Sequence, residues 1–408
     1  MNKRKRSSEC NYNGKVVPII PVTEDDEEKR DSELLRQMHP LLIAFMFAGL
    51  DFRPQSARGC DTSVTYRERS INILLAIINI ISWLYASIAI YGTIAIEGSM
   101  PMKHYISSQF VEILTIFLRS VLYWRRKDIT NNLRHLSDAY DKIKHKSKNL
   151  NKGVISVLVV VFPGVYIIAY VLVLLTFISE GEMLFKNFLR KRYFNIIPLT
   201  LSSHVYYLLG INDVWLFSVN NVPVCLFIIL MFIVCTILCH ILQDYCKSIN
   251  SSGATFEVLQ RRHIAEMNTV KMVDKCLSFP LFILLGFHIL LLFFIVAFFN
   301  SKTNFKHGPS VEKIFYYAVF ILYSIQYFVI TIFAAKVHEE VQNIKTEVAK
   351  MDGRPTQLTA VEQLLLIAKV NSHSNICLTV WGFLNITKNF VFSSIGALLT
   401  FGALFRDL

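Results

Sequence analysis

The feature that most constrains the fold is a series of seven apolar blocks, each long enough to span a lipid bilayer. A transmembrane helix needs ~20 mostly apolar residues, because each residue rises only ~1.5 Å across the hydrocarbon. Five of the blocks contain no Asp, Glu, Lys or Arg, which a surface helix of a soluble domain would not tolerate. We therefore predict an all-α fold, a seven-transmembrane helix bundle. The blocks cover 71–92, 105–124, 154–177, 215–242, 277–299, 314–335 and 376–405.

The composition excludes several other classes of protein. Only 18% of the residues are charged, whereas soluble domains have about a quarter. Eight Cys in 408 residues are too sparse for a secreted disulfide scaffold. The sequence has no phosphate-binding loop, paired His-Glu metal signature or nucleophile elbow. We expect no enzymatic activity, no catalytic residues, no metal and no cofactor.

The distribution of Lys and Arg predicts the orientation in the membrane. If the chain begins in the cytosol, its cytosolic segments hold 31 of the 42 Lys and Arg, and the opposite side holds nine. Positive charge favours the cytosolic side, and the connection 125–152 alone carries nine basic residues. We predict a cytosolic N-terminus and an extracellular C-terminus. This orientation accounts for the net charge of +12, so nucleic acid is not expected as a partner.

The cytosolic connections contain apolar stripes that favour helix packing. One stripe follows the sixth block and a second follows the break at 353–355, each with steps of three and four residues. Their helices are too polar to enter lipid, so the stripes either pack within one chain or form a core shared by several subunits. The stripe residues that we predict to mediate assembly are Val341, Ile344, Val348, Leu358 and Leu365.

These features divide the chain into six predicted segments. They are a cytosolic N-terminal segment (1–70), helices one to four (71–242), a cytosolic helical loop (243–276), helices five and six (277–335), cytosolic anchor helices (336–375) and the seventh helix (376–408). A shorter apolar block, 41–50, is expected to be interfacial or packed before the first span.

The chain ends with Thr400-Phe401, five further residues and Asp407-Leu408. This resembles the end of arthropod gustatory receptors, in the seven-transmembrane insect chemoreceptor superfamily, where Thr-Tyr precedes five mostly apolar residues and Gln-Phe. The spacing is the same and only the Thr is identical, which indicates a divergent member. The seven blocks and the predicted orientation extend the resemblance to the architecture of the whole chain.

The resemblance implies a taste receptor in the plasma membrane that is a ligand-gated, cation-permeable channel. Its partners would be a small-molecule tastant, membrane lipid and further subunits, in a homotetramer or a hetero-oligomer with related receptors. By position, Leu404 corresponds to the family's hydrophobic gate, which closes by dewetting. Asp407 would form an acidic ring at the outer mouth that favours cations, unless it is only a solvated chain end. The pore candidates are Thr400, Phe401, Leu404, Phe405 and Asp407.

Charged residues within the predicted spans are the next candidates for function. Lys388 lies in the seventh block and costs ~2.5–3.5 kcal/mol to insert alone, so we expect a partner or water. Glu112 is the natural partner, because it is the one acidic residue within a span. Glu112 and Arg119 lie two turns apart on one helix face, so either also qualifies to face an aqueous cavity.

In the resembled family the ligand pocket lies in the outer half of the bundle, among the second to sixth helices. Such pockets are mostly apolar, with a few polar groups that orient the ligand. Tyr and Trp also gather at membrane interfaces as anchors, which is the alternative role for each candidate. The candidates are Gln109, Tyr166, Tyr170, Trp215, Asn220, Tyr316 and Tyr323.

Two other functions compete with a channel. A G-protein-coupled-type heptahelical receptor would need the opposite orientation, and the sequence lacks Asp-Arg-Tyr and Asn-Pro-x-x-Tyr motifs. A multi-pass transporter would often show repeated halves and several intramembrane ionisable groups. Seven spans do not divide into equal halves, so the channel is favoured over both.

Overall fold

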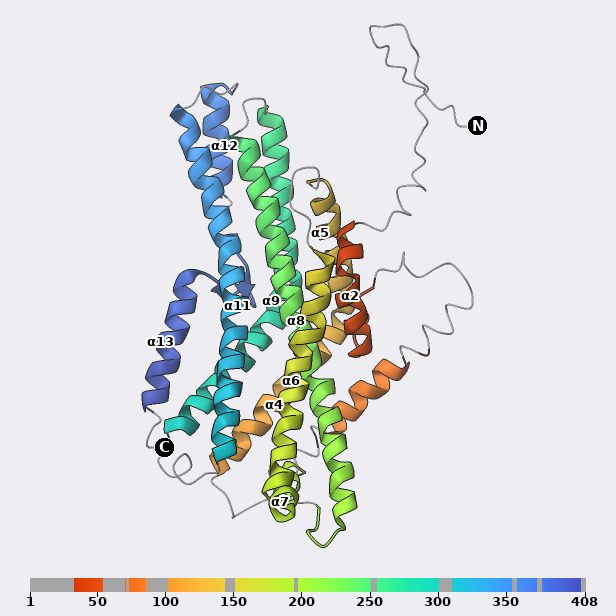
Figure 1. Cartoon of the computed structure of the whole chain (residues 1–408). Helices are drawn as coiled ribbons and strands as arrows, with labels where there is room; N and C mark the ends of the chain where they lie inside the picture. Colours follow the sequence, from red (N-terminus) through yellow and green to blue (C-terminus); the bar gives the residue numbers. More distant parts are fainter. Residues whose placement is uncertain are drawn as a thin grey trace, which may run out of the picture. The chain divides into compact units, whose positions relative to one another are not determined.

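The computed structural model describes residues 33–53, 70, 73–85, 87, 102–143, 151–193, 197–250, 255–300, 310–353, 358–372 and 376–404. These residues form an all-α bundle with one short hairpin, in agreement with the predicted fold class (Figure 1). The first elements are α2 (Glu33–Phe47), the helix Ile73–Tyr85, α4 (Met102–Trp124), α5 (Arg126–Asp141), α6 (Lys152–Glu180) and α7 (Glu182–Arg192). They are followed by α8 (Ser203–Ile249), α9 (Phe256–Asn300), α11 (Ser310–Ala349), η3 (Lys350–Gly353), α12 (Ala360–Ser372), β1 (Thr379–Val380), β2 (Leu384–Asn385) and α13 (Lys388–Leu404).

Four helices of the described chain, α6, α8, α9 and α11, are long and apolar enough to cross a membrane. We therefore treat the chain as a multi-pass membrane protein. Three of the four extend well beyond the predicted spans, since α8, α9 and α11 have 47, 45 and 40 residues. A helix of that length measures roughly 60–70 Å, about twice the hydrocarbon thickness. The predicted cytosolic segment 243–276 is thus largely a continuation of membrane helices, and the segment 336–375 continues α11 as far as Ala349.

The continuation has a simple physical cause. No Gly or Pro lies near residue 336 in α11, Pro280 lies one turn after the junction at residue 276 without ending α9, and the polar halves keep an apolar stripe on one side. In α9 that stripe contains Leu259, Met267 and Val270, all of which are buried. The stripe packs the polar half of α9 against its neighbours, so the helix does not end at the membrane boundary.

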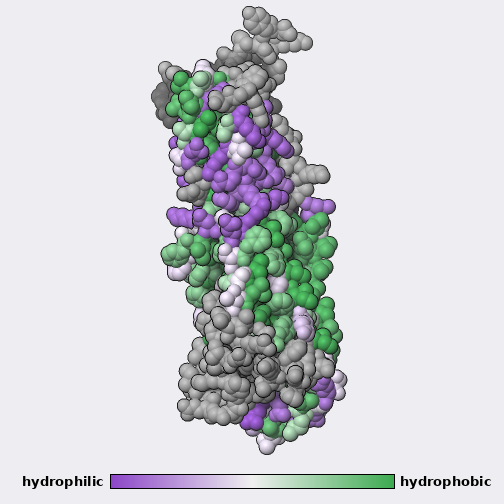
Figure 2. Space-filling view, turned by 90° about the vertical axis from the view of Figure 1, so that its left-hand side faces the viewer, coloured by the Kyte–Doolittle hydropathy of each residue, from purple (hydrophilic) through white to green (hydrophobic). Residues whose placement is uncertain are grey.

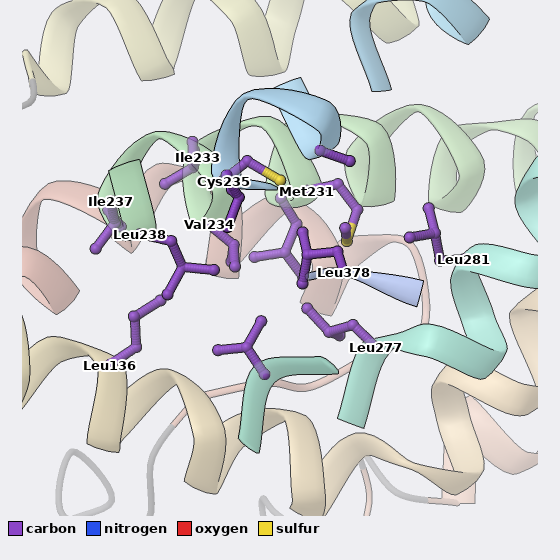
Figure 3. Packing of buried hydrophobic residues seen from close by; sticks show 14 of the residues in the cluster. Leu136, Met231, Ile233, Val234, Cys235, Ile237, Leu238, Leu277, Leu281 and Leu378 are labelled. Atoms are coloured by element: carbon purple, nitrogen blue, oxygen red, sulfur yellow. The ribbon is translucent and has the colours of Figure 1, made fainter. Parts of the chain in front are cut away.

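The core is built around α8. Its residues from Val224 to Leu242 are nearly all buried, as expected for a helix that is apolar on every side. It packs on α11, α6, α4 and α9. Leu136 of α5, Leu277 and Leu281 of α9, and Leu378 join the same cluster (Figure 3). The segment before α13 is therefore fixed to the central helix.

The seventh block differs from the prediction, because residues 376–387 are not helical. They form the β1–β2 hairpin, in which Thr379 pairs with Asn385 and Val380 with Leu384. The loop residues Trp381 (φ +52°) and Gly382 (φ +74°) adopt the left-handed conformation, which ends a helix. Asp274 of α9 stabilises the hairpin by accepting hydrogen bonds from the backbone and hydroxyl of Thr379 (2.6 and 3.0 Å). The helix of the seventh block therefore begins at Lys388.

One helix lies where the sequence predicted only a connection, and another contains the block that was expected to be interfacial or packed. The basic connection 125–152 contains α5, which buries Ile129, Leu133, Leu136 and Tyr140 on one face. The block 41–50 is part of α2, which packs on α5, α6 and α8. The spacing of four, three and four residues in α5 was a usable signal, and the surrounding positive charge obscured it.

The surface changes character along the long helices. On the side shown in Figure 2, a polar surface gives way to an apolar one farther from α12, and a small apolar patch lies at the α12 end. The lipid-facing side of α6 is likewise apolar, with exposed Val157, Val160, Ile168 and Leu172. This change agrees with long helices that leave the bilayer on one side.

Candidate ligand site and pore helix

A buried aromatic cluster joins α6, α9 and α11. The Tyr323 ring centroid lies 5.6 Å from Tyr166, 5.6 Å from Phe287 and 5.7 Å from His288, all in edge-to-face orientation. Phe162 packs against Tyr166 at 6.0 Å. The hydroxyl of Tyr166 is buried and has no hydrogen-bond partner among the described residues. An apolar, aromatic cluster with an unpaired hydroxyl matches the chemistry of a small-molecule site.

His288 adds polar groups to the same cluster. Its Nδ1 lies 2.7 Å from the carbonyl oxygen of Leu284, and its Nε2 lies 2.8 Å from Gln326 Oε1, a position that the amide nitrogen takes if the side-chain amide is turned over. A carbonyl only accepts, so Nδ1 carries the proton. A neutral imidazole then accepts at Nε2, which requires the Gln326 amide nitrogen to face His288. The Gln326 oxygen is thereby left as a buried acceptor.

A second buried group lies between α6 and α8. Tyr170 donates a short hydrogen bond to Asp213 and stacks on Phe217, with ring centroids 4.0 Å apart. Asp213 is completely buried, as is most of Asn220 two turns farther along α8. Sequence reasoning missed Asp213, because the fourth span was placed two residues too late.

The structure brings together only part of the predicted pocket. Tyr166 and Tyr323 contact each other, while Tyr170 and Asn220 lie buried close to α8. Trp215 is 42% exposed, which fits the anchor role better. The side chains of Gln109 and Tyr316 lie outside the described residues. His288, Gln326, Phe287 and Asp213 were not among the predicted pocket residues.

Arg119 is fully buried in the described chain. Its Nη1 donates to Ser82 Oγ (2.9 Å) and to the Val219 carbonyl (3.5 Å). A Cβ at Gly49 would lie 2.6 Å from Arg119 Nη2, and Gly49 has φ +94°. Glycine at the end of α2 therefore permits both the left-handed turn and the close approach of the guanidinium.

Lys388 pairs with Glu339 of α11, with Nζ 2.7 Å from Oε1, and not with Glu112 as predicted. The cause is the hairpin, which places Lys388 at the first position of α13 beside the polar half of α11. Farther along, the hydroxyls of Tyr327 on α11 and Ser394 on α13 form a short hydrogen bond. The helix α13 is thus attached at two points to the helix that carries Tyr323 and Gln326.

The exposed face of α13 contains a stripe of small and polar residues, flanked by the exposed apolar side chains of Phe392 (71%) and Leu399 (65%). Asn389, Ser393, Gly396 and Thr400 are exposed at intervals of four, three and four residues, so they share one face. The backbone of Leu404 ends α13, and its side chain and that of Phe401 are not described. Phe405 and Asp407 lie outside the described residues.

The predicted assembly residues separate into two groups. Val341, Ile344, Val348 and Leu358 are buried within the single chain, so they do not form an exposed shared surface. Leu365 is exposed, together with Val361 and Leu364 on the same face of α12. Of the predicted assembly residues, Leu365 is therefore the one that lies on an exposed apolar face.

Comparison with protein-family models and with curated proteins finds no match. Among solved structures, the chain resembles the insect olfactory receptor OR5 from Machilis hrabei, with a TM-score of 0.63 and 11% identity. That match covers 91% of this chain and 97% of the receptor. The structure of the same receptor in complex with eugenol matches with a TM-score of 0.59 and 11% identity. That match covers 92% of this chain and 99% of the receptor. The chain thus has the helical fold seen in an insect olfactory receptor.

Proposed function

We propose that this protein is a gustatory chemoreceptor that acts as a ligand-gated, non-selective cation channel in the plasma membrane. The observation that carries the proposal is the exposed face of α13. Asn389, Ser393, Gly396 and Thr400 form a small, polar stripe on a helix of otherwise apolar composition, which suits contact with water. Several copies of such a helix around an axis would line a hydrophilic path.

In this proposal the gate lies at the C-terminal end of α13. Leu404 supplies an apolar ring once per subunit, and Thr400, Phe401 and Phe405 would narrow the path beside it. A narrow apolar ring empties of water and stops ions without a plug. Asp407 would provide a ring of negative charge at the outer mouth, which favours cations.

The ligand site in this proposal is the cluster around Tyr166, Tyr323 and His288. It offers aromatic walls, the Tyr166 hydroxyl and the Gln326 amide oxygen, which suit a small molecule with an aromatic or apolar body and one polar group. The structurally similar receptor OR5 is known in complex with eugenol. Binding would reach the pore helix through α11, because Tyr327 follows Gln326 and contacts Ser394.

Assembly and orientation complete the proposal. The exposed α12 residues Val361, Leu364 and Leu365 would pack against equivalent helices of neighbouring subunits in a tetramer, homomeric or mixed. The excess of Lys and Arg on one side would place α12 in the cytosol and the end of α13 outside.

The direct test is purified protein in planar bilayers that contain no G protein. A panel of sugars, bitter compounds and small aromatic molecules, including eugenol, is applied while current is recorded. The channel predicts discrete cation current evoked by at least one compound. Binding without current would favour a G-protein-coupled-type receptor, and substrate flux without discrete openings would favour a transporter.

A further inference from the structure

An exposed aromatic surface lies beside the hairpin that precedes α13. The Trp381 ring centroid is 5.2 Å from Phe279, 5.2 Å from Phe282 and 5.3 Å from Phe383. Trp381 is 48% exposed and Phe282 39%. Phe117 of α4 extends the surface toward the membrane interior, 6.4 Å from Phe279.

The hairpin holds Trp381 in place at some conformational cost. Among the described residues, Trp381 is the one non-glycine with positive φ (+52°), a conformation that L side chains rarely adopt. Its backbone N–H donates to the Ser278 carbonyl (3.2 Å), and Thr379 binds Asp274. These contacts fix the indole against α9 while leaving about half of it uncovered.

Positive charge lies directly beside the aromatic surface. On α9, Lys271, Lys275, Phe279 and Phe282 follow one another at steps of four, four and three residues, so they share a face. Arg125, the residue between α4 and α5, donates to the Lys275 and Cys276 carbonyls (3.3 and 3.1 Å), and its guanidinium lies 5.5 Å from the Phe279 centroid. The two lysines are exposed, and no ion pair in the described part of the chain involves them.

The change from charge to aromatic surface occurs where the apolar half of α9 begins, at Leu277. Phosphate groups of a bilayer lie just outside the hydrocarbon, at the level that Lys and Trp side chains favour. Asp274 on this stretch of α9 accepts hydrogen bonds from Thr379, and Asp128 of α5 lies near Cys276, so two carboxylates stand against the three cations Lys271, Lys275 and Arg125 and leave a net positive charge. The charge at this level is therefore complementary to an anionic headgroup.

We propose that Lys271, Lys275 and Arg125 bind the headgroup of an anionic phospholipid, whose acyl chain lies on Phe279, Phe282 and Trp381. The occupant is a lipid because the cations and the aromatic surface meet at the membrane boundary in the order in which a phospholipid presents phosphate and chain. This site is independent of the proposed ligand pocket and does not require that the protein conducts ions. It contacts the hairpin that leads directly into α13.

The test uses Trp381 as a fluorescent reporter in the full-length protein. Trp83, Trp124 and Trp215 are replaced with Phe, and the protein is reconstituted in phosphatidylcholine vesicles. An equal small fraction of either phosphatidylserine or phosphatidylcholine carries bromine on its acyl chains, which quenches a neighbouring indole. We expect stronger quenching by the brominated phosphatidylserine. Lys271→Gln with Lys275→Gln should lower the apparent affinity for that lipid roughly thirtyfold. Each lysine near an anionic membrane surface contributes about 1 kcal/mol, which is a factor of about five in affinity.

Lys152→Gln is the matched control, since it removes an exposed lysine at the start of α6, which does not pack on α9 or α13. It should leave the selective quenching unchanged. Equal quenching by the two brominated lipids would overturn the proposal, as would selectivity that survives in the double lysine variant. Absence of quenching by either lipid would also overturn it, because it would mean that another protein surface covers Trp381.

Discussion

Lys388 Nζ lies 2.7 Å from Glu339 Oε1, so the first residue of α13 is paired with the polar half of α11. The side chains are 70% and 38% exposed, and pairs of this kind contribute at most about 1 kcal/mol. We expect Glu339→Gln to leave thermal stability nearly unchanged. It should shift the closed-to-open equilibrium by up to about fivefold, because the pair holds the base of the proposed pore helix. Resting and evoked current, normalised to surface expression, measures the shift.

The charge-reversed double variant E339K/K388E separates the pair from its single residues. It should return the current to that of the unaltered protein. Glu347→Gln is the matched control, since it removes a similar pair with Lys350 on α11. The pairing has no role in gating if E339Q and E347Q behave alike, or if the double variant behaves like the single one.

A second prediction concerns Glu266 in the polar half of α9. Burial raises the pKa of Glu266 to about 7 from an ordinary value of 4.5. The charge of Arg262 opposes this rise in pKa, but the Arg262 guanidinium also pairs with Asp244, with Nη2 2.5 Å from Oδ2. The folded state therefore binds the proton more tightly than the unfolded chain. This contribution to stability is complete below pH 4.5 and is lost as the pH rises to about 7, on the order of 3 kcal/mol at most.

Thermal unfolding in detergent across this pH range measures the effect. Glu266→Gln removes the titrating group, so its unfolding temperature should fall less between the two pH values than that of the unaltered protein. Glu257→Gln on the same helix is the control, because Glu257 is highly exposed and should not alter the slope. A slope that is the same in all three proteins would contradict the burial effect.

A third prediction distinguishes packing within one chain from packing between subunits. Leu364 on α12 is 65% exposed, so Leu364→Asp should abolish chemical crosslinking between subunits while each chain remains folded. Ile344 is buried in the chain, so Ile344→Asp should destabilise the chain itself by several kcal/mol. Val258→Asp, an equal change at an exposed position of α9, should do neither. Crosslinked oligomers that persist in L364D would place the shared surface elsewhere.

A fourth prediction concerns orientation and rests on the distribution of Lys and Arg. An epitope inserted before Lys15 should bind antibody only after cells are permeabilised. An epitope after Leu408 should bind antibody on intact cells. Labelling of the N-terminal epitope on intact cells would reverse the orientation and remove the link to the seven-helix chemoreceptors.

The apolar blocks were sufficient to predict the helical bundle, because long runs such as 154–177 leave few alternatives. The length of the helices was not predicted, since continuity at α9 depends on a buried stripe that looks weak beside many charges. The break before α13 was also missed. Residues 376–387 are apolar enough for a helix, and the hairpin is selected by Asp274, which lies 105 positions before Thr379.

The candidate site was likewise predicted only in part. Tyr166 and Tyr323 were identified, because aromatic residues in the outer halves of the spans are easily recognised in sequence. The partner of Lys388 was wrong, since Glu339 was assigned to a separate cytosolic helix and not to the continuation of α11. His288 and Gln326 come from different helices, and neither has a sequence signal that links it to the other.

The central claim, that α13 lines a gated pore, has one direct measurement that needs no known ligand. Leu404→Ser should wet the gate and give cation current at rest. In that background, with the native cysteines replaced, Thr400→Cys is treated with a charged thiol reagent from outside, and Val391→Cys serves as control because Val391 is buried. We predict that modification at position 400 blocks the resting current and that the position 391 variant is unaffected. Normal surface expression of L404S without resting current, or confirmed labelling at position 400 without block, would contradict the claim.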